Sequence, residues 1–394
     1  MTKRTLLAAA LFSSFGLFVP FAARPPVVVV LSQGGRWWAP SRALGLVLAL
    51  ATLGCGAEAE HPEALTPRLI GHSPAPLSDN TYIALADPQT ACIIESFEYR
   101  VVCIDPAGAT VRRLGSQGEG PGEFRNPASI FRQSAGTVAV FDPKLARLTM
   151  FAATGSVTLS KISSPAPIWI TALHGNRVHG SVGFGPRPNG PPEVENQVLN
   201  LTSGEIIWRR SIYETARTEC GNVGSLYPRP GGGYVLQACK KDLVFLADLD
   251  SAAALVVESP AHRVELPGQR DVDAYLSDVA RLGGGAVPPS AMEPYAAAFR
   301  ERPKSWFHGP GIFKFDSQDR IWVATTRDRD THSYFDIWAD TEYLGAVQIR
   351  GRLMGYDLLD STLAVLVERQ PDQNGIAPRG IDWYDVADVD FGRN

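Results

Sequence analysis

Residues 91–95 read Ala-Cys-Ile-Ile-Glu and residues 100–104 read Arg-Val-Val-Cys-Ile, so that two apolar runs flank a short turn. The same arrangement returns 47 residues later, with Val-Ala-Val-Phe-Asp at 138–142 and Arg-Leu-Thr-Met-Phe at 147–151, and the two copies align without a gap. A glycine turn and a further β-rich run follow each copy. A repeating unit of about 40–50 residues with four short strands is typical of one blade of a β-propeller.

Weaker copies of this pattern continue to the end of the chain. Innermost strands are expected near residues 80, 128, 168, 223, 311 and 353, which predicts six blades. The chain ends soon after its last apolar run, so the sixth blade needs a fourth strand from elsewhere. We expect residues 64–72 to supply it, because closing the ring in this way removes an exposed sheet edge. The prediction is an all-β fold, a six-bladed β-propeller over residues 79–394.

A glycine-rich link, LGSQGEGPGEFRNP at residues 114–127, joins the two clearest copies. Its Gly122, Phe124 and Pro127 form a Gly-x-Phe-x-x-Pro stretch that resembles the inter-blade signature of NHL-type six-bladed β-propellers. Glycine permits positive φ at the crossing, Phe124 is expected to wedge between neighbouring sheets, and proline can begin a strand without a ladder donor. The resemblance covers about residues 80–390 and extends to bacterial six-bladed propeller lipoproteins.

One region, residues 266–308, breaks the repeat. Its sequence predicts two short helices joined by a Gly/Pro-rich loop, and insertions of this kind fall on one face of a propeller. The pair either forms a lid or contact surface, or packs over a blade edge for structural reasons. Trp306 and Phe307 follow the second helix, and we expect them to line a partner-binding pocket under the insertion.

Residues 1–55 are interpreted as a leader rather than as part of the fold. An apolar run ends in Thr-Leu-Gly-Cys at Cys55, with arginines upstream and no acidic residue before it, which is the charge layout of a secretion signal. The ending resembles a bacterial lipobox, which implies acylation of Cys55, a tether over 56–78 and attachment to the outer membrane. An ordinary signal peptide, a membrane anchor and an over-extended start remain open alternatives.

Four further cysteines suit an oxidising compartment. Cys92 and Cys103 flank a four-residue turn, and Cys220 and Cys239 flank the Pro/Gly-rich residues 228–233. Opposed residues of antiparallel strands come within disulfide range, so we predict the pairs Cys92–Cys103 and Cys220–Cys239. Four buried free thiols are the alternative, and neither pair has the close spacing of a metal site.

Charge and motifs exclude several classes of function. Loss of residues 1–54 removes five cationic residues and no acidic ones, which changes the net charge from −4 to −9 and argues against a nucleic-acid partner. No nucleophile elbow, His-Glu-x-x-His or phosphate-binding loop is present. His174 and His179 are expected to be solvated turn or rim residues on opposite faces of a strand, a poor metal pair.

These observations favour a binding or scaffolding propeller of the cell envelope, without a cofactor or metal and without catalytic residues. Its partner would be a protein, a peptide or a glycan, and its membrane association would come from the lipid anchor. The alternative is a metal-assisted hydrolase or lyase with its site in the propeller channel. That site would need carboxylates or histidines to recur on the inner strands, which are poor in such groups.

Overall fold

The computed structural model describes most of the chain after residue 63. The described ranges are 64–75, 81–134, 136–164, 168–183, 194–211, 224–238, 241–251, 254–282, 288–308, 313–328, 331–373 and 377–391. The leader 1–55 with Cys55, the first part of the tether, and Cys220 and Cys239 lie outside these residues. Within them, no helix is both long enough and apolar enough to cross a bilayer.

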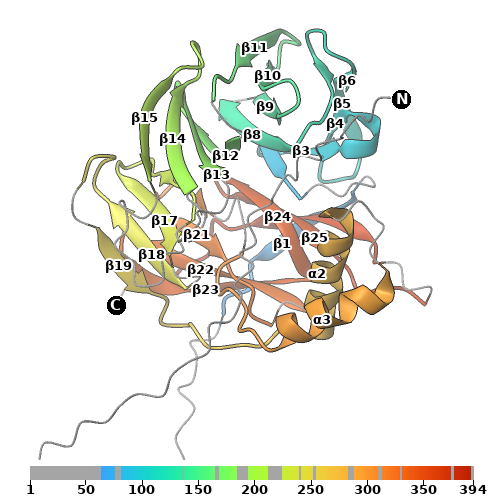
Figure 1. Cartoon of the computed structure of the whole chain (residues 1–394), viewed down its shortest axis with the longest axis vertical. Coiled ribbons are helices and arrows are strands. Elements are labelled where there is room, and N and C mark those ends of the chain that lie inside the picture. The colour runs from blue at the N-terminus through green and yellow to red at the C-terminus, as the bar shows by residue number, and fades with distance from the viewer. Residues whose placement is uncertain are drawn as a thin grey trace, which may run out of the picture. The chain divides into compact units, whose positions relative to one another are not determined.

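Six four-stranded antiparallel sheets form the blades of the ring, which confirms the predicted six-bladed β-propeller (Figure 1). Each of the first three blades uses four strands in chain order. Blade 1 contains β2 (Ile83–Asp87), β3 (Thr90–Glu95), β4 (Arg100–Ile104) and β5 (Thr110–Leu114); blade 2 contains β8 (Ser129–Ser134), β9 (Thr137–Asp142), β10 (Arg147–Phe151) and β11 (Val157–Lys161); blade 3 contains β12 (Ile168–His174), β13 (Arg177–Gly183), β14 (Val194–Asn200) and β15 (Ile206–Ser211).

The next two blades follow the same order, and the last one borrows a strand. Blade 4 contains β16 (Tyr227–Pro228), β17 (Tyr234–Ala238), β18 (Asp242–Leu246) and β19 (Leu255–Glu258); blade 5 contains β20 (Phe313–Phe315), β21 (Ile321–Ala324), β22 (His332–Ala339) and β23 (Glu342–Arg350); blade 6 contains β24 (Arg352–Leu359), β25 (Thr362–Glu368), β26 (Arg379–Asp385) and β1 (Arg68–Pro74). β1 pairs antiparallel with β26 as the outermost strand of blade 6, so the two ends of the propeller meet in one sheet.

The 47-residue repeat holds strand by strand in blades 1 and 2. The bounds of β9, β10 and β11 are those of β3, β4 and β5 displaced by 47 residues. The turn glycines Gly108 and Gly155 occupy the same displaced positions, and both have φ of +86°. Two copies of one sequence pattern therefore adopt one backbone conformation.

The link between blades 1 and 2 packs as the glycine-rich motif predicts. Phe124, in the short strand β7 (Glu123–Phe124), is fully buried among side chains of both blades and lies 5.9 Å from the ring of Phe151. β7 pairs with β6 (Ser116–Gln117). Gly115 has φ of +87°, and a Cβ there would lie 2.3 Å from the Phe124 ring, so a side chain is excluded.

A buried carboxylate holds this link in place. Asp142 accepts hydrogen bonds from the backbone N–H groups of Arg125 and Asn126 at 2.6 and 2.9 Å. Its other oxygen accepts from the N–H groups of Lys144 and Leu145 in the β9–β10 turn. A single side chain therefore satisfies donors on both sides of the crossing, which would otherwise be buried at a cost.

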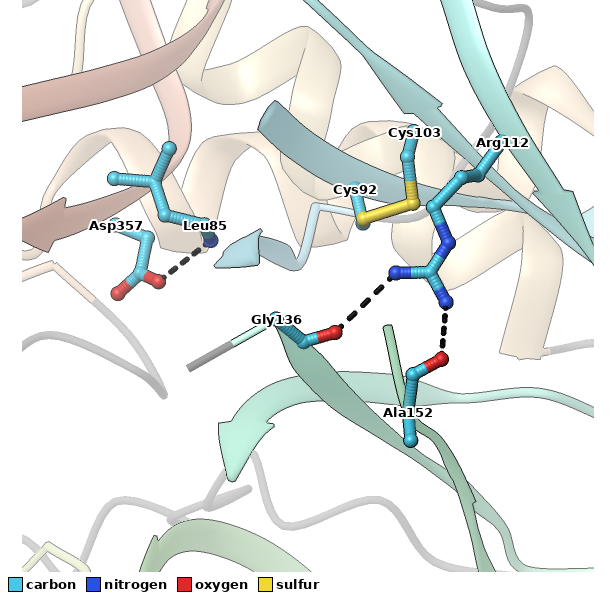
Figure 2. The surroundings of a disulfide bond; sticks show 7 residues. All are labelled: Leu85, Cys92, Cys103, Arg112, Gly136, Ala152 and Asp357. Atoms are coloured by element: carbon cyan, nitrogen blue, oxygen red, sulfur yellow. Dashed lines mark hydrogen bonds between the residues drawn. A yellow bond between two sulfur atoms is a disulfide. The ribbon is translucent and has the colours of Figure 1, made fainter. Parts of the chain in front are cut away.

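The predicted disulfide Cys92–Cys103 is confirmed (Figure 2). The two cysteines are directly paired across β3 and β4, with Cα atoms 3.9 Å apart. The turn between these strands is the 3-10 helix η1 (Ser96–Glu98), followed by Tyr99 in the left-handed region. The bond therefore closes one hairpin within a single blade.

Hydrogen bonds to backbone groups join neighbouring blades at two further places in Figure 2. The Arg112 guanidinium of blade 1 donates to the carbonyl oxygens of Gly136 and Ala152 in two turns of blade 2, at 3.2 and 2.9 Å. On the other side of blade 1, the Leu85 N–H donates to the buried carboxylate of Asp357 in β24 at 2.8 Å. Asp357 also forms an ion pair with Lys314 of blade 5 at 2.8 Å.

The region that breaks the repeat contains the predicted helix pair, α2 (Gln269–Leu282) and α3 (Pro289–Arg300). α3 begins earlier than its apolar pattern indicates, because Pro289 stands at the first helical turn, where a missing N–H costs nothing. The rings of Tyr275 and Phe299 stack at 4.3 Å between the two helices. The helices lie side by side near β24 and β25 in Figure 1.

Candidate functional site

The insertion lies on one face of the ring, which we call the insertion face. In each antiparallel blade, the loop between the second and third strands and the link to the next blade emerge at the same end. The insertion is the link from β19 to β20, and it contacts the second loops of blades 5 and 6 through Asp328 and Glu368. The η1 turn of blade 1 belongs to the same face.

Buried and half-buried ion pairs fasten the insertion to the blades. Arg352 at the start of β24 pairs with Asp271 of α2 at 3.0 Å, and both side chains are buried. Arg270 pairs with Glu368 at the end of β25 at 2.9 Å. Because removing one partner of a buried pair leaves an uncompensated charge, these contacts resist displacement of α2. Of the two roles left open by the sequence, the contacts favour a fixed helix pair over a mobile lid.

A second group of contacts anchors the segments on either side of the helices. Lys304, after α3, pairs with Glu265, before α2, at 2.7 Å and donates to the Thr326 carbonyl of blade 5 at 2.8 Å. Burial opposes ionisation of Glu265, but the hydrogen bonds from Lys304 and Arg263 outweigh it and hold the pKa of that carboxyl below its ordinary value. The segment before α2 and the segment after α3 are therefore joined by the same group of ion pairs.

The insertion face exposes large apolar side chains. Among the large hydrophobic residues that the structure describes, the three most exposed are Phe97 at 72%, Val264 at 71% and Leu266 at 61%. Phe97 is in the η1 turn, and the other two alternate with the anchored Arg263 and Glu265. Tyr295 on α3 is also exposed. Val264 and Leu266 are therefore exposed on a backbone that ion pairs anchor.

The two residues that the sequence assigned to partner binding are buried and do not belong to this exposed surface. Trp306 and Phe307 are 3% and 1% exposed and belong to the hydrophobic core between blades 4 and 5. The Trp306 indole N–H donates to Asp336 at 3.0 Å. The aromatic pair is thus buried as a core element, because the apolar strands on both sides cover it, and it offers no side-chain surface to a partner.

Asp336 is a buried group that the sequence did not single out. It is fully buried in β22, where one carboxylate oxygen accepts from the Ser259 hydroxyl at 2.6 Å and from Trp306. Burial raises the pKa of Asp336 above its ordinary value, and these hydrogen bonds offset the effect only in part. Its regular strand position, among alternating apolar residues, gives no signal of this environment.

The expectation for His174 and His179 is wrong in two respects. His179 is 1% exposed, not solvated. The two residues also lie on different strands of one hairpin: His174 pairs with Arg177, and Ala172 pairs with His179. Because alternate residues of a strand share a face, His174, Arg177 and His179 project from the same face of blade 3. The prediction assumed a single strand between the two histidines, but a tight turn at Gly175 separates them.

Catalytic and metal-binding arrangements are not apparent in the part of the chain that the structure describes. Within it, no three His, Cys, Asp or Glu side chains gather closely enough to hold a metal ion. In the acidic loop of blade 5, Asp328 pairs with Arg263 of the insertion. The predicted lipid attachment at Cys55 and the predicted Cys220–Cys239 disulfide fall outside the described residues and stay predictions.

No protein-family model and no curated protein matches this chain. Similar solved structures include a Bacteroides fragilis protein thought to be exported, at 11% identity over 83% of this chain and 98% of that one, with a TM-score of 0.44. A streptogramin B lyase matches at 9% identity over 81% and 99% of the two chains, with a TM-score of 0.44. Regucalcin, a calcium-binding protein of Agrobacterium tumefaciens, matches at 14% identity over 82% and 97%, with a TM-score of 0.37. At such identities no activity transfers to this chain.

Proposed function

We propose that this protein is an envelope lipoprotein, tethered through Cys55, whose propeller binds a protein or peptide partner on the insertion face. The observation that carries the proposal is the exposure of Val264 and Leu266 on a backbone that ion pairs hold in place. A fixed aliphatic surface loses little conformational entropy on binding, so burying it contributes directly to affinity.

Site-specific photo-crosslinking in cells tests the binding surface. A photoreactive residue replaces Val264 in one variant and Leu255 in another; Leu255 is 53% exposed on the outer strand β19, away from the insertion. We expect a discrete crosslinked protein or peptide band from position 264 and none from position 255. The double substitution Val264→Asp/Leu266→Asp should abolish the band when the photoreactive residue stands at Tyr295. Equal crosslinking at 255 and 264 would contradict the proposal.

The tether has a separate test. Mass spectrometry of the membrane fraction should find an acylated N-terminal peptide that begins at Cys55, and Cys55→Ser should release the protein from membranes. An unlipidated mature protein in the wild-type strain would rule out the anchor while leaving the binding surface untouched.

A further inference from the structure

A cleft of about 510 Å³ lies between blades 3 and 4, on the face opposite the insertion. The β12–β13 turn forms one wall and the β16–β17 turn, residues 228–233, forms the other. These turns join first and second strands, which places them at the other end of the blades from the insertion. The residues that give the cleft its character are His174, Arg177, His179, Ile207, Arg229 and Tyr234.

The imidazole of His179 forms the buried base of the cleft. Neither Nδ1 nor Nε2 has a hydrogen-bond partner among the residues that the structure describes, although the side chain is almost completely buried. Its ring contacts that of Tyr234 from blade 4, with centroids 5.8 Å apart. Burial, with smaller contributions from His174 and Arg177, lowers the pKa of His179 to about 3. The imidazole is therefore neutral at ordinary pH, with one N–H to donate and one nitrogen to accept.

The charged groups at the cleft are all cationic or potentially so. Arg177 projects from the same face as His179, and its guanidinium forms no hydrogen bond or ion pair with another described residue. Arg229 forms an ion pair with Asp340, while its buried Nε has no partner. No Asp or Glu is among the described residues that line the cleft, and Asp340 lies behind Arg229 as its ion-pair partner. An anion would find donors on Arg177 and His179 here.

The remaining wall is apolar. Ile207 is 51% exposed, and Pro228, Pro230 and the ring of Tyr234 complete this side. We propose that the cleft binds a small organic carboxylate, with the Arg177 guanidinium and the His179 N–H on its carboxylate group and its apolar body against the proline and isoleucine side. A planar guanidinium matches the two oxygens of a carboxylate, and binding sites combine such polar groups with apolar walls. The site is independent of the partner surface on the insertion face.

Titration with four small probes tests the assignment. Benzoate has the charge and an apolar body, acetate has the charge alone, benzamide has the body without the charge, and inorganic phosphate is a different oxyanion. Binding to the purified protein is measured by calorimetry and by the ring ¹⁵N shifts of ¹⁵N-histidine-labelled protein. We expect benzoate to shift the His179 signals saturably and to bind at least tenfold more tightly than acetate. Benzamide and phosphate should give no saturable shift.

Two variants locate the site. Arg177→Gln should weaken benzoate binding roughly tenfold to a hundredfold, the effect of losing one charge-assisted hydrogen bond. His179→Phe should abolish it. Arg113→Gln, at an exposed arginine on β5 of blade 1, is the matched control and should leave binding unchanged. Arg177 is exposed at the start of β13, so its variant remains informative even if His179→Phe fails to fold.

Three results would overturn the proposal. The first is the absence of any saturable shift with benzoate. The second is an equal loss of binding in the Arg113 and Arg177 variants, which would reflect net charge alone. The third is phosphate binding at least as tight as that of benzoate, which would assign the cleft to a different anion. Val264→Asp/Leu266→Asp should leave benzoate binding intact, which separates this site from the proposed partner surface.

Discussion

The interface between blades 1 and 2 and the interface between blades 3 and 4 both bury apolar side chains, but they differ in the polar groups that they bury. The first closes apolar side chains of both blades around Phe124, and among the described residues its unbonded buried polar atoms are the Thr149 hydroxyl and Arg147 Nε. The second buries a whole imidazole, His179, and a whole carboxamide, Asn196, with neither end of either group bonded. Leaving buried polar groups unpaired costs about 1–3 kcal/mol each.

This difference separates a structural joint from a candidate site. Blades 1 and 2 keep the 47-residue repeat, and their interface contributes to stability in proportion to the apolar area that it buries. Blades 3 and 4 depart from the repeat, and one of the unpaired groups in their interface, the His179 imidazole, lies at the base of a cleft. Local violations of folding rules are expected where a protein acts rather than where it is merely held together.

The largest expected effect is the loss of the wedge in the apolar interface. Phe124→Ala should lower the free energy of unfolding by about 3–5 kcal/mol, because it empties a fully buried ring site between two blades. Urea denaturation measures the change. Phe97→Ala, at a phenylalanine that is 72% exposed, is the control and should stay within about 0.5 kcal/mol of wild type. A loss below about 1 kcal/mol for Phe124→Ala would mean that the link does not hold these blades.

The disulfide of blade 1 should contribute the next largest effect. Cys92→Ala/Cys103→Ala is expected to lower the free energy of unfolding by about 2–3 kcal/mol, mainly because the unfolded chain regains the freedom of the closed loop. Wild-type protein unfolded in urea with and without a reductant should show a difference of similar size. If reductant has no effect on wild type, the bond is absent from the purified protein.

The polar interface should make stability depend on pH. The folded state lowers the pKa of His179 from 6.5 to about 3, so between these values the unfolded chain binds the extra proton and stability falls as the pH falls. From pH 7 to pH 5 this residue should account for a loss of about 2 kcal/mol. His179→Phe should remove that part of the slope, while His174→Gln, at an exposed position, should keep it. Identical slopes in all three proteins would show that His179 is not buried in its neutral form.

The same histidine gives a contrast at constant pH. At pH 7, His179→Phe should leave stability within about 1 kcal/mol of wild type, since it replaces an unpaired polar ring by an apolar one of similar size. No such tolerance is expected for a polar residue at Phe124, where Phe124→His should destabilise strongly. The pair of exchanges thus compares the two interfaces directly.

The smallest expected effect concerns the hydrogen bonds from blade 1 to the turns of blade 2. Arg112→Met should cost about 1 kcal/mol, because two half-buried hydrogen bonds to carbonyls are lost while the side-chain stem is kept. The neighbouring Arg113 is exposed, so Arg113→Met should have almost no effect. Equal effects of the two exchanges would mean that these bonds add nothing to the joint.

Local periodic signals account for what the sequence predicted correctly. The number of blades, the link at Gly122–Phe124 and the Cys92–Cys103 pair all depend on residues close in sequence or repeated at a fixed interval. The four bonds to Asp142 and the bridging role of Arg112 were not predicted, because each connects a side chain to backbone groups of another segment. Hydrophobic periodicity carries no information about such partners.

The sequence by itself determined the ring of six blades, the inserted helix pair and the hairpin that the disulfide closes, since strand alternation, turn glycines and repeat length act over tens of residues. Only the tertiary structure decided which face of each strand meets which neighbour. It buried Trp306 and Phe307 in the core, left Val264 and Leu266 exposed, and turned His179 toward a cleft beside Tyr234. The physical reason is that burial and pairing depend on what a neighbouring blade brings, and that blade is far away in sequence.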